Sequence, residues 1–169
     1  MFGSQLQFGI LAYGCAPKSK LKKIVTLQKK CIRHVANVGY RAHADPIFHD
    51  LEILKFDDIF KYNILCFMHQ FNTNRLPSSF NGMFTLIRET EERNVRDDFY
   101  NYEVSVPIKK SITHFPRVIF PPIWNSLNSQ YQCTESHKVF KNDCKSFILS
   151  EYGEFAGCDD LSCPQCINY

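Results

Sequence analysis

The sequence predicts a mainly α-helical, bundle-like domain with at most one short β-ribbon. Apolar residues recur at helical spacing in three long segments, over residues 19–37, 57–71 and 136–152. Hydrophobic residues make up 44% of the 169 residues, and 15 Phe, eight Tyr and one Trp supply large side chains for a core. Prolines confine the remaining β-like pieces to short, edge-like strands.

Two helices are expected in the first 40 residues. Residues 5–14 predict a short apolar helix that ends near Gly14, and Pro17 separates it from a longer helix over residues 19–37. Gly39 is expected to close that longer helix as a C-terminal cap. Its core-facing positions are predicted to be Leu21, Ile24, Val25, Leu27, Cys31, Ile32 and Val35.

Two more helices follow in the middle of the chain. Asp45 predicts an N-cap with Pro46 at the first helical position, opening a short helix through residue 54. The inward positions of this helix are predicted to be Ile47, Phe48, Leu51 and Leu54. Asp57 or Asp58 is expected to cap the next helix, which is apolar over most of its circumference and is therefore predicted to be central and buried.

The last third predicts less regular structure before a final helix. Residues 88–101 indicate a loop, and residues 103–106 and 118–120 have strand character. Trp124 begins a helical turn and is expected to hold this segment to the core rather than to stack on a base. Ser136 caps an amphipathic helix whose inner face is predicted to be Val139, Phe140, Cys144, Phe147, Ile148 and Tyr152. We therefore expect one helical domain over residues 1–152 and a Cys-rich tail over residues 153–169.

Charge is distributed unevenly along the chain. Residues 1–44 contain eight Lys or Arg and no carboxylate, whereas the remaining 125 residues contain 12 basic and 17 acidic residues. At 3.6 residues per turn, Lys22, Lys23, Thr26, Lys29, Lys30 and Arg33 fall within roughly a third of the helical circumference. Such a stripe indicates a partner that is a polyanion, although a solvated helix face is the simpler alternative. The predicted nucleic-acid-binding residues are Lys22, Lys23, Lys29, Lys30 and Arg33.

Several other classes of site are weighed and not favoured. Cys158, Cys163 and Cys166 have metal-ligand spacing, but they supply only three local ligands, so reduced thiols without zinc are predicted. The six His residues are scattered, and His49 and His69 are expected on helix surfaces or edges. No catalytic residue, cofactor or small-molecule substrate is therefore predicted.

No apolar run approaches the roughly 18 residues that a membrane span needs. The first 15 residues lack the basic start of a signal peptide. We therefore expect an intracellular chain, nuclear or cytoplasmic, that is not secreted.

An ordered series of short segments carries a family resemblance. The series comprises residues 8–10, 13–14, 27–33, 42–46, 51–55, 58–62, 75–77, 94–96, 123–127 (Ile-Trp-Asn-Ser-Leu) and 140–149. Together these segments resemble the region C-terminal to the polymerase core in reverse transcriptases of non-LTR retrotransposons, of the jockey and related LINE-type clades. This chain departs from the family where Arg93-Asn94 replaces Tyr-x, where Val95 replaces Thr, where Phe120 replaces Gly and where Asn128 replaces Pro.

The resemblance implies a fragment of an RNA-directed DNA polymerase that lacks its catalytic palm. Such a palm holds two metal ions on an Asp-Asp hairpin, but none of the three Asp-Asp pairs here is flanked by hydrophobic strands: Asp57-Asp58, Asp97-Asp98 and Asp159-Asp160. The isolated chain is therefore not expected to polymerise, and its predicted contribution is binding of an RNA or DNA backbone. The alternative is a small helical interaction module for an acidic protein or an anionic membrane surface.

Overall fold

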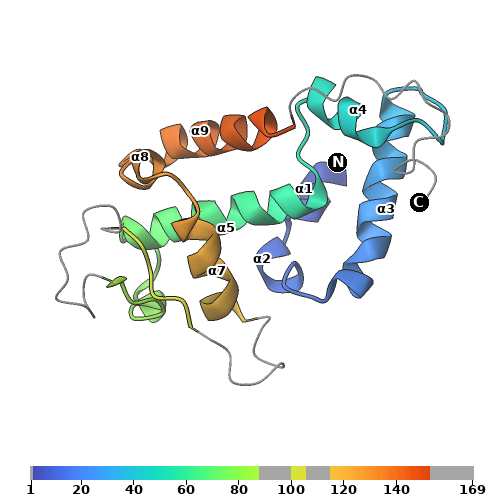
Figure 1. Ribbon diagram of the computed structural model, residues 1–169. Helices are drawn as coiled ribbons and strands as arrows, with labels where there is room; N and C mark the ends of the chain where they lie inside the picture. The colour runs from blue at the N-terminus through green and yellow to red at the C-terminus, as the bar shows by residue number, and fades with distance from the viewer. Residues whose placement is uncertain (1, 88–99, 106–114, 153–169) are drawn as a thin grey trace.

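The computed structural model describes residues 2–87, 100–105 and 115–152, and within these it is mainly helical (Figure 1). The helices are α1 (Phe2–Gln7), α2 (Ile10–Tyr13), α3 (Lys18–Val35), α4 (Ala44–Asp50), α5 (Phe56–Asn72), η1 (Ser78–Phe80), α7 (Pro116–Asn125), α8 (Ser129–Gln132) and α9 (His137–Ser150). The one β-type pairing of the described residues is an isolated bridge between Leu86 and Tyr102. The predicted mainly α fold is confirmed, and the tail over residues 153–169 lies outside the described residues.

Helix α5 is the centre of the fold, as its nearly all-round apolar pattern predicted. It packs against α9, α7, α2, α1 and α3. Figure 1 shows α9 lying along α5 in the opposite direction, with α3 crossing near the first turns of α5. The main core cluster joins α5 to α7 and α9 through Ile64, Leu65, Met68, Trp124, Phe140 and Cys144. A second cluster joins the start of α5 to α1, α2 and α3. In both clusters apolar side chains are removed from water, which stabilises the fold.

The N-terminal segment differs from the single helix expected over residues 5–14. Gly9 adopts a left-handed conformation (φ 66°) that divides the segment into α1 and α2. Gly14 is buried against α5, where an added Cβ would lie 2.4 Å from the Phe60 ring. This glycine therefore permits the close approach of α2 to the central helix, and the neighbouring Cys15 is buried as well.

The helix termini use other caps than those predicted. Asn37, not Gly39, takes the left-handed position after α3 (φ 53°), and the Val38 N–H donates to the Arg33 carbonyl oxygen. The His43 side chain, not Asp45, caps α4 by accepting from the Asp45 N–H. Lys55 occupies the N-cap of α5, so Asp57 and Asp58 lie in its first turn, where carboxylates favour the helix dipole. Ser136 is the N-cap of α9 as predicted.

The predicted strand over residues 118–120 is wrong, because these residues belong to α7. Pro116 begins this helix, where a missing N–H costs nothing, but Pro121 and Pro122 lie inside it and remove two helical hydrogen bonds. Burial of Phe120, Pro121 and Trp124 offsets that loss. Trp124 thus lies near the end of a helix, not at the start of one.

Some predicted inward positions face water instead. Leu51 and Val139 are exposed, whereas Phe48, Leu54, Phe140, Cys144 and Ile148 are buried as predicted.

Free thiols are present at Cys15, Cys31, Cys66, Cys133 and Cys144. Burial raises the pKa of Cys66 to about 11 and that of Cys144 to about 12, so both thiols stay protonated and unreactive at neutral pH.

Polar contacts link α5 to α9 at both ends of this helix pair. At one end, the Tyr152 hydroxyl donates to the Asp58 carboxylate and accepts from the Lys55 N–H at 2.7 Å. Burial raises the pKa of Asp58, against the lowering effect of the bond from Tyr152. The other end is closed by two histidines, His69 of α5 and His137 of α9, whose Nδ1 atoms lie 3.1 Å apart.

His69 is fully buried, so its predicted place on a helix surface is wrong. Its Nε2 lies 2.6 Å from the Thr134 carbonyl oxygen and must carry a hydrogen. The Nδ1 of neutral His69 therefore accepts from the Nδ1–H of His137, and the His137 Nε2 accepts from the Gln70 amide at 3.1 Å. This chain of hydrogen bonds requires both imidazoles to be neutral.

The histidine pair predicts a loss of stability in acid. Burial is the main cause that lowers the pKa of His69 and of His137 in the folded protein, and Arg75 adds to the lowering in both cases. The unfolded chain, with an ordinary pKa of about 6.5, then binds more protons. The free energy of unfolding is therefore expected to fall as pH decreases below about 6.5, measured by urea denaturation between pH 7.5 and pH 5.

His137→Ala tests whether this pair causes the effect. The variant is expected to be less stable at pH 7.5 by about 1–3 kcal/mol, because the buried Nδ1 of His69 loses its donor. Its stability should also depend less on pH than that of the wild type. His34→Ala, at an exposed position of α3, is the control and should keep the wild-type pH dependence. An equally steep pH dependence in His137→Ala would contradict the assignment.

Candidate polyanion-binding groove

Helix α3 carries the candidate site, and one buried polar side chain fixes how it is turned. Leu21, Gln28 and Ile32 are its buried residues. The Gln28 amide donates to the Leu54 carbonyl oxygen at 2.9 Å. Leu54 lies in the segment that connects α4 to α5. Because Gln28 lies seven residues after Leu21, both side chains point to the same side of the helix. The cationic residues are thereby turned toward solvent.

Two residues predicted to face the core are exposed. The rotation accounts for Leu27, whereas Val35 lies on the buried side, seven residues after Gln28, but is the last residue of α3. Leu27 is 53% exposed and Val35 is 67% exposed, while Ile24, Val25 and Cys31 are half-buried. At 100° per residue, Leu27 lies more than 100° from the side defined by Leu21 and Ile32. The apolar pattern predicts an inward position for Leu27 and does not predict one for the polar Gln28.

The predicted binding residues differ in exposure. Lys22, Lys23 and Lys30 are exposed, and Lys29 and Arg33 are half-buried. Lys22, Lys23 and Lys30 form no ion pair with any carboxylate in the part of the chain that the structure describes. These three ammonium groups are therefore available to an external anion.

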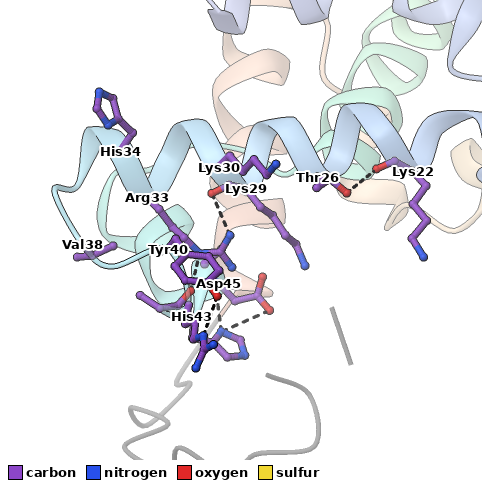
Figure 2. Close-up of a pocket in the computed structure, with 13 residues that line it drawn as sticks. Lys22, Thr26, Lys29, Lys30, Arg33, His34, Val38, Tyr40, His43 and Asp45 are labelled. Carbon is purple, nitrogen blue, oxygen red and sulfur yellow. Dashed lines mark hydrogen bonds and ion pairs between the residues drawn. The ribbon is translucent and has the colours of Figure 1, made fainter. Parts of the chain in front are cut away.

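An open groove of about 900 Å³ runs between α3 and the segment that leads into α4. Figure 2 shows Lys22, Lys29 and Arg33 leaving α3 on the side of that segment, whereas His34 points away. Four of the five predicted residues line the groove, namely Lys22, Lys29, Lys30 and Arg33, and Lys23 does not. The opposite wall comes from the segment over residues 38–45 and contributes Tyr40, Arg41, His43 and Asp45.

Arg33 has a structural role that the sequence did not reveal. Its Nε donates to the Ala42 carbonyl oxygen at 2.6 Å, and its Nη1 lies 3.4 Å from the Lys29 carbonyl oxygen (Figure 2). A guanidinium group bonded to two main-chain carbonyls ties the 38–45 segment to α3. Arg33 therefore shapes the groove, and part of its hydrogen-bonding capacity is already used.

Asp45 is the one carboxylate that lines the groove among the described residues, and its charge is offset. The Lys55 ammonium lies 3.2 Å from an Asp45 oxygen and offsets its charge. Lys22, Lys29 and Lys30 provide the opposing cationic surface, and Arg41 adds positive charge to the wall that carries Asp45. The groove as a whole is suited to bind an anion that carries several charges.

The wall formed by Tyr40, Arg41 and His43 was not predicted from the sequence. Arg41 is one of the eight basic residues of the segment 1–44. Helical spacing, however, does not predict where a residue after the end of the helix lies, so it gives no sign that Arg41 faces Lys29. The available signal was the Tyr40-Arg41 pair directly after the predicted helix end. Only the left-handed turn at Asn37, which reverses the chain, brings this pair back beside α3.

The other sites weighed from the sequence provide no binding surface among the described residues. Trp124 is fully buried and its Nε1–H donates to the Tyr100 carbonyl oxygen at 2.9 Å, so its predicted role in the core is confirmed. No group of three or more His, Cys, Asp or Glu suited to a metal is found in the described ranges. Cys158, Cys163 and Cys166 lie outside those ranges, as do Asp97-Asp98 and Asp159-Asp160.

Comparison of the chain with models of known protein families, with curated proteins and with solved structures finds no match. Among the described helices, none is long and apolar enough to cross a membrane.

Removal of the Arg33 guanidinium is expected to loosen the groove wall without unfolding the protein. In Arg33→Met, loss of the bond to Ala42 should raise amide hydrogen exchange at residues 39–42 roughly five- to hundredfold, since such bonds contribute about 1–3 kcal/mol. Lys30→Met removes the same charge from an exposed side chain that forms no hydrogen bond with a described residue, and it should leave exchange unchanged. Equal exchange in the two variants would show that Arg33 does not hold the segment.

Proposed function

We propose that the groove between α3 and the 38–45 segment binds the phosphate backbone of RNA or DNA. The observation that carries this proposal is the placement of Lys22 and Lys29 on one wall and Arg41 on the other, with Asp45 held by Lys55. Lys22 and Lys29 are separated by about 10 Å along the helix axis, so they can neutralise different phosphates. Contacts of this kind supply affinity without reading base sequence.

We further propose that the chain corresponds to the C-terminal region of a non-LTR retrotransposon RNA-directed DNA polymerase, acting inside the cell. The support for this relationship is the ordered series of short sequence segments described above. Asp57-Asp58 lies in the first turn of α5 and not on a β-hairpin. In such a polymerase the groove would hold template or target nucleic acid while another part of the enzyme performs the chemistry.

The alternative of membrane attachment would use the apolar side of α3. Leu21 and Ile32 are buried, and Ile24 packs on the second core cluster. Leu27, Cys31 and Val35 form one apolar row on α3, but it is only three residues long and Cys31 within it is half-buried. The groove, by contrast, gathers cations from two separate segments, and this favours a phosphate polymer over a lipid surface.

Charge reversal in the groove tests the proposed function. Lys22→Glu with Lys29→Glu is expected to weaken binding of a mixed-sequence RNA–DNA hybrid at least tenfold at 50 mM salt, measured by fluorescence anisotropy. The slope of log K against log salt concentration should become shallower by roughly 1.5, because two phosphate contacts are lost.

The matched control is Lys138→Glu with Lys145→Glu on α9. These two lysines are exposed, have the same seven-residue spacing and change the net charge by the same amount. The control variant should bind like the wild type. Equal weakening by both pairs would indicate a general charge effect, and binding only to phosphatidylserine vesicles would favour the membrane alternative; either result contradicts the proposed groove.

A further inference from the structure

We propose that Tyr40 stacks on a base in the groove, so that the groove prefers single-stranded nucleic acid to a duplex. This inference rests on the proposed function and deepens it by naming the form of the ligand. It joins two features: a cationic wall on α3 and an exposed aromatic ring opposite it (Figure 2).

Tyr40 is presented to solvent by an ordered turn. Its side chain is 78% exposed although it lines the groove. Asn37 reverses the chain, the Ala42 N–H donates to the Gly39 carbonyl oxygen at 3.0 Å, and Arg33 holds the Ala42 carbonyl oxygen. The backbone on both sides of Tyr40 is thereby fixed, and a base would meet a ring whose position is already set.

Arg41 orients the Tyr40 ring and leaves one face open. The Arg41 Nε donates to the Tyr40 hydroxyl at 2.9 Å, and its Cζ lies 5.4 Å from the ring centroid. A guanidinium over one face is a cation–π contact, and the high exposure of Tyr40 keeps the other face accessible. The same Arg41 also adds positive charge for the adjoining phosphate.

No other described aromatic side chain combines exposure with a cationic groove. Trp124 and Tyr102 are buried in the core, where Tyr102 contacts Phe71 and Phe84 edge to face. Phe8 and Phe115 are exposed, but neither lines the groove.

The preference for single strands follows from which bases can reach the ring. In a duplex each base is already stacked between its neighbours, so only its phosphates are available to α3. In a single strand a base can leave the stack and lie on an aromatic side chain, which strengthens binding by roughly five- to hundredfold per base. Lys22 and Lys29 would bind both forms, and Tyr40 would strengthen binding of the single strand alone.

The test compares two labelled oligonucleotides of equal length, oligo-dT and a fully abasic strand, by fluorescence anisotropy with the full chain. The wild type is expected to bind oligo-dT at least fivefold more tightly than the abasic strand. Tyr40→Ala should bind both strands with the affinity that the wild type has for the abasic one. Tyr40→Phe should keep the preference because it keeps the ring, and Phe115→Ala is the control at an exposed aromatic outside the groove.

The outcomes separate this inference from the proposed function. A Tyr40→Ala variant that still prefers oligo-dT, with wild-type helicity by circular dichroism, overturns the role of Tyr40 and leaves phosphate binding intact. Wild-type protein that binds neither strand overturns the proposed function itself. Loss of RNA–DNA hybrid binding in Tyr40→Ala would also overturn the inference, since a hybrid offers the ring no free base.

Discussion

The hydrogen bond from the Gln28 amide to the Leu54 carbonyl oxygen is the constraint on which the candidate site depends. A buried amide left without a partner costs about 1–3 kcal/mol, so rotations of α3 that break this bond are disfavoured. An amphipathic helix could otherwise turn by tens of degrees and still bury some apolar surface, because Leu27 and Cys31 also offer it. Gln28 selects the rotation in which Lys22 and Lys29 face the groove and Leu27 faces solvent.

The groove is coupled to the core through a short series of polar contacts. Asp45 in the groove binds the Lys55 ammonium, which also lies 4.5 Å from the centroid of the Tyr152 ring. Tyr152, which follows the end of α9, in turn donates to Asp58 on the central helix. Asp45 is thus neutralised by a residue whose position is set by the α5–α9 pair.

The sequence predicted the fold class and the cationic face well, for physical reasons that can be stated. Helical spacing of apolar residues identified α3, α5 and α9, and the nearly all-round apolar pattern of α5 placed it at the centre. It failed where a local rule competed with packing: the prolines of α7 argued against a helix that burial of Trp124 stabilises. It also failed for His69, because a buried imidazole needs partners such as His137 that are distant in sequence. The groove wall at Tyr40 depends on a chain reversal that periodicity does not reveal.

The segment between α3 and α4 is attached to the rest of the molecule chiefly at its two ends and through one arginine. Val38, Tyr40 and Arg41 are exposed and take no part in any of the core clusters. Replacements among these three residues would alter what the groove recognises while leaving the packing of α5 untouched. A chain built in this way can diversify its ligand preference by changes in a few surface positions, with little penalty to folding, because recognition and stability are assigned to separate sets of residues.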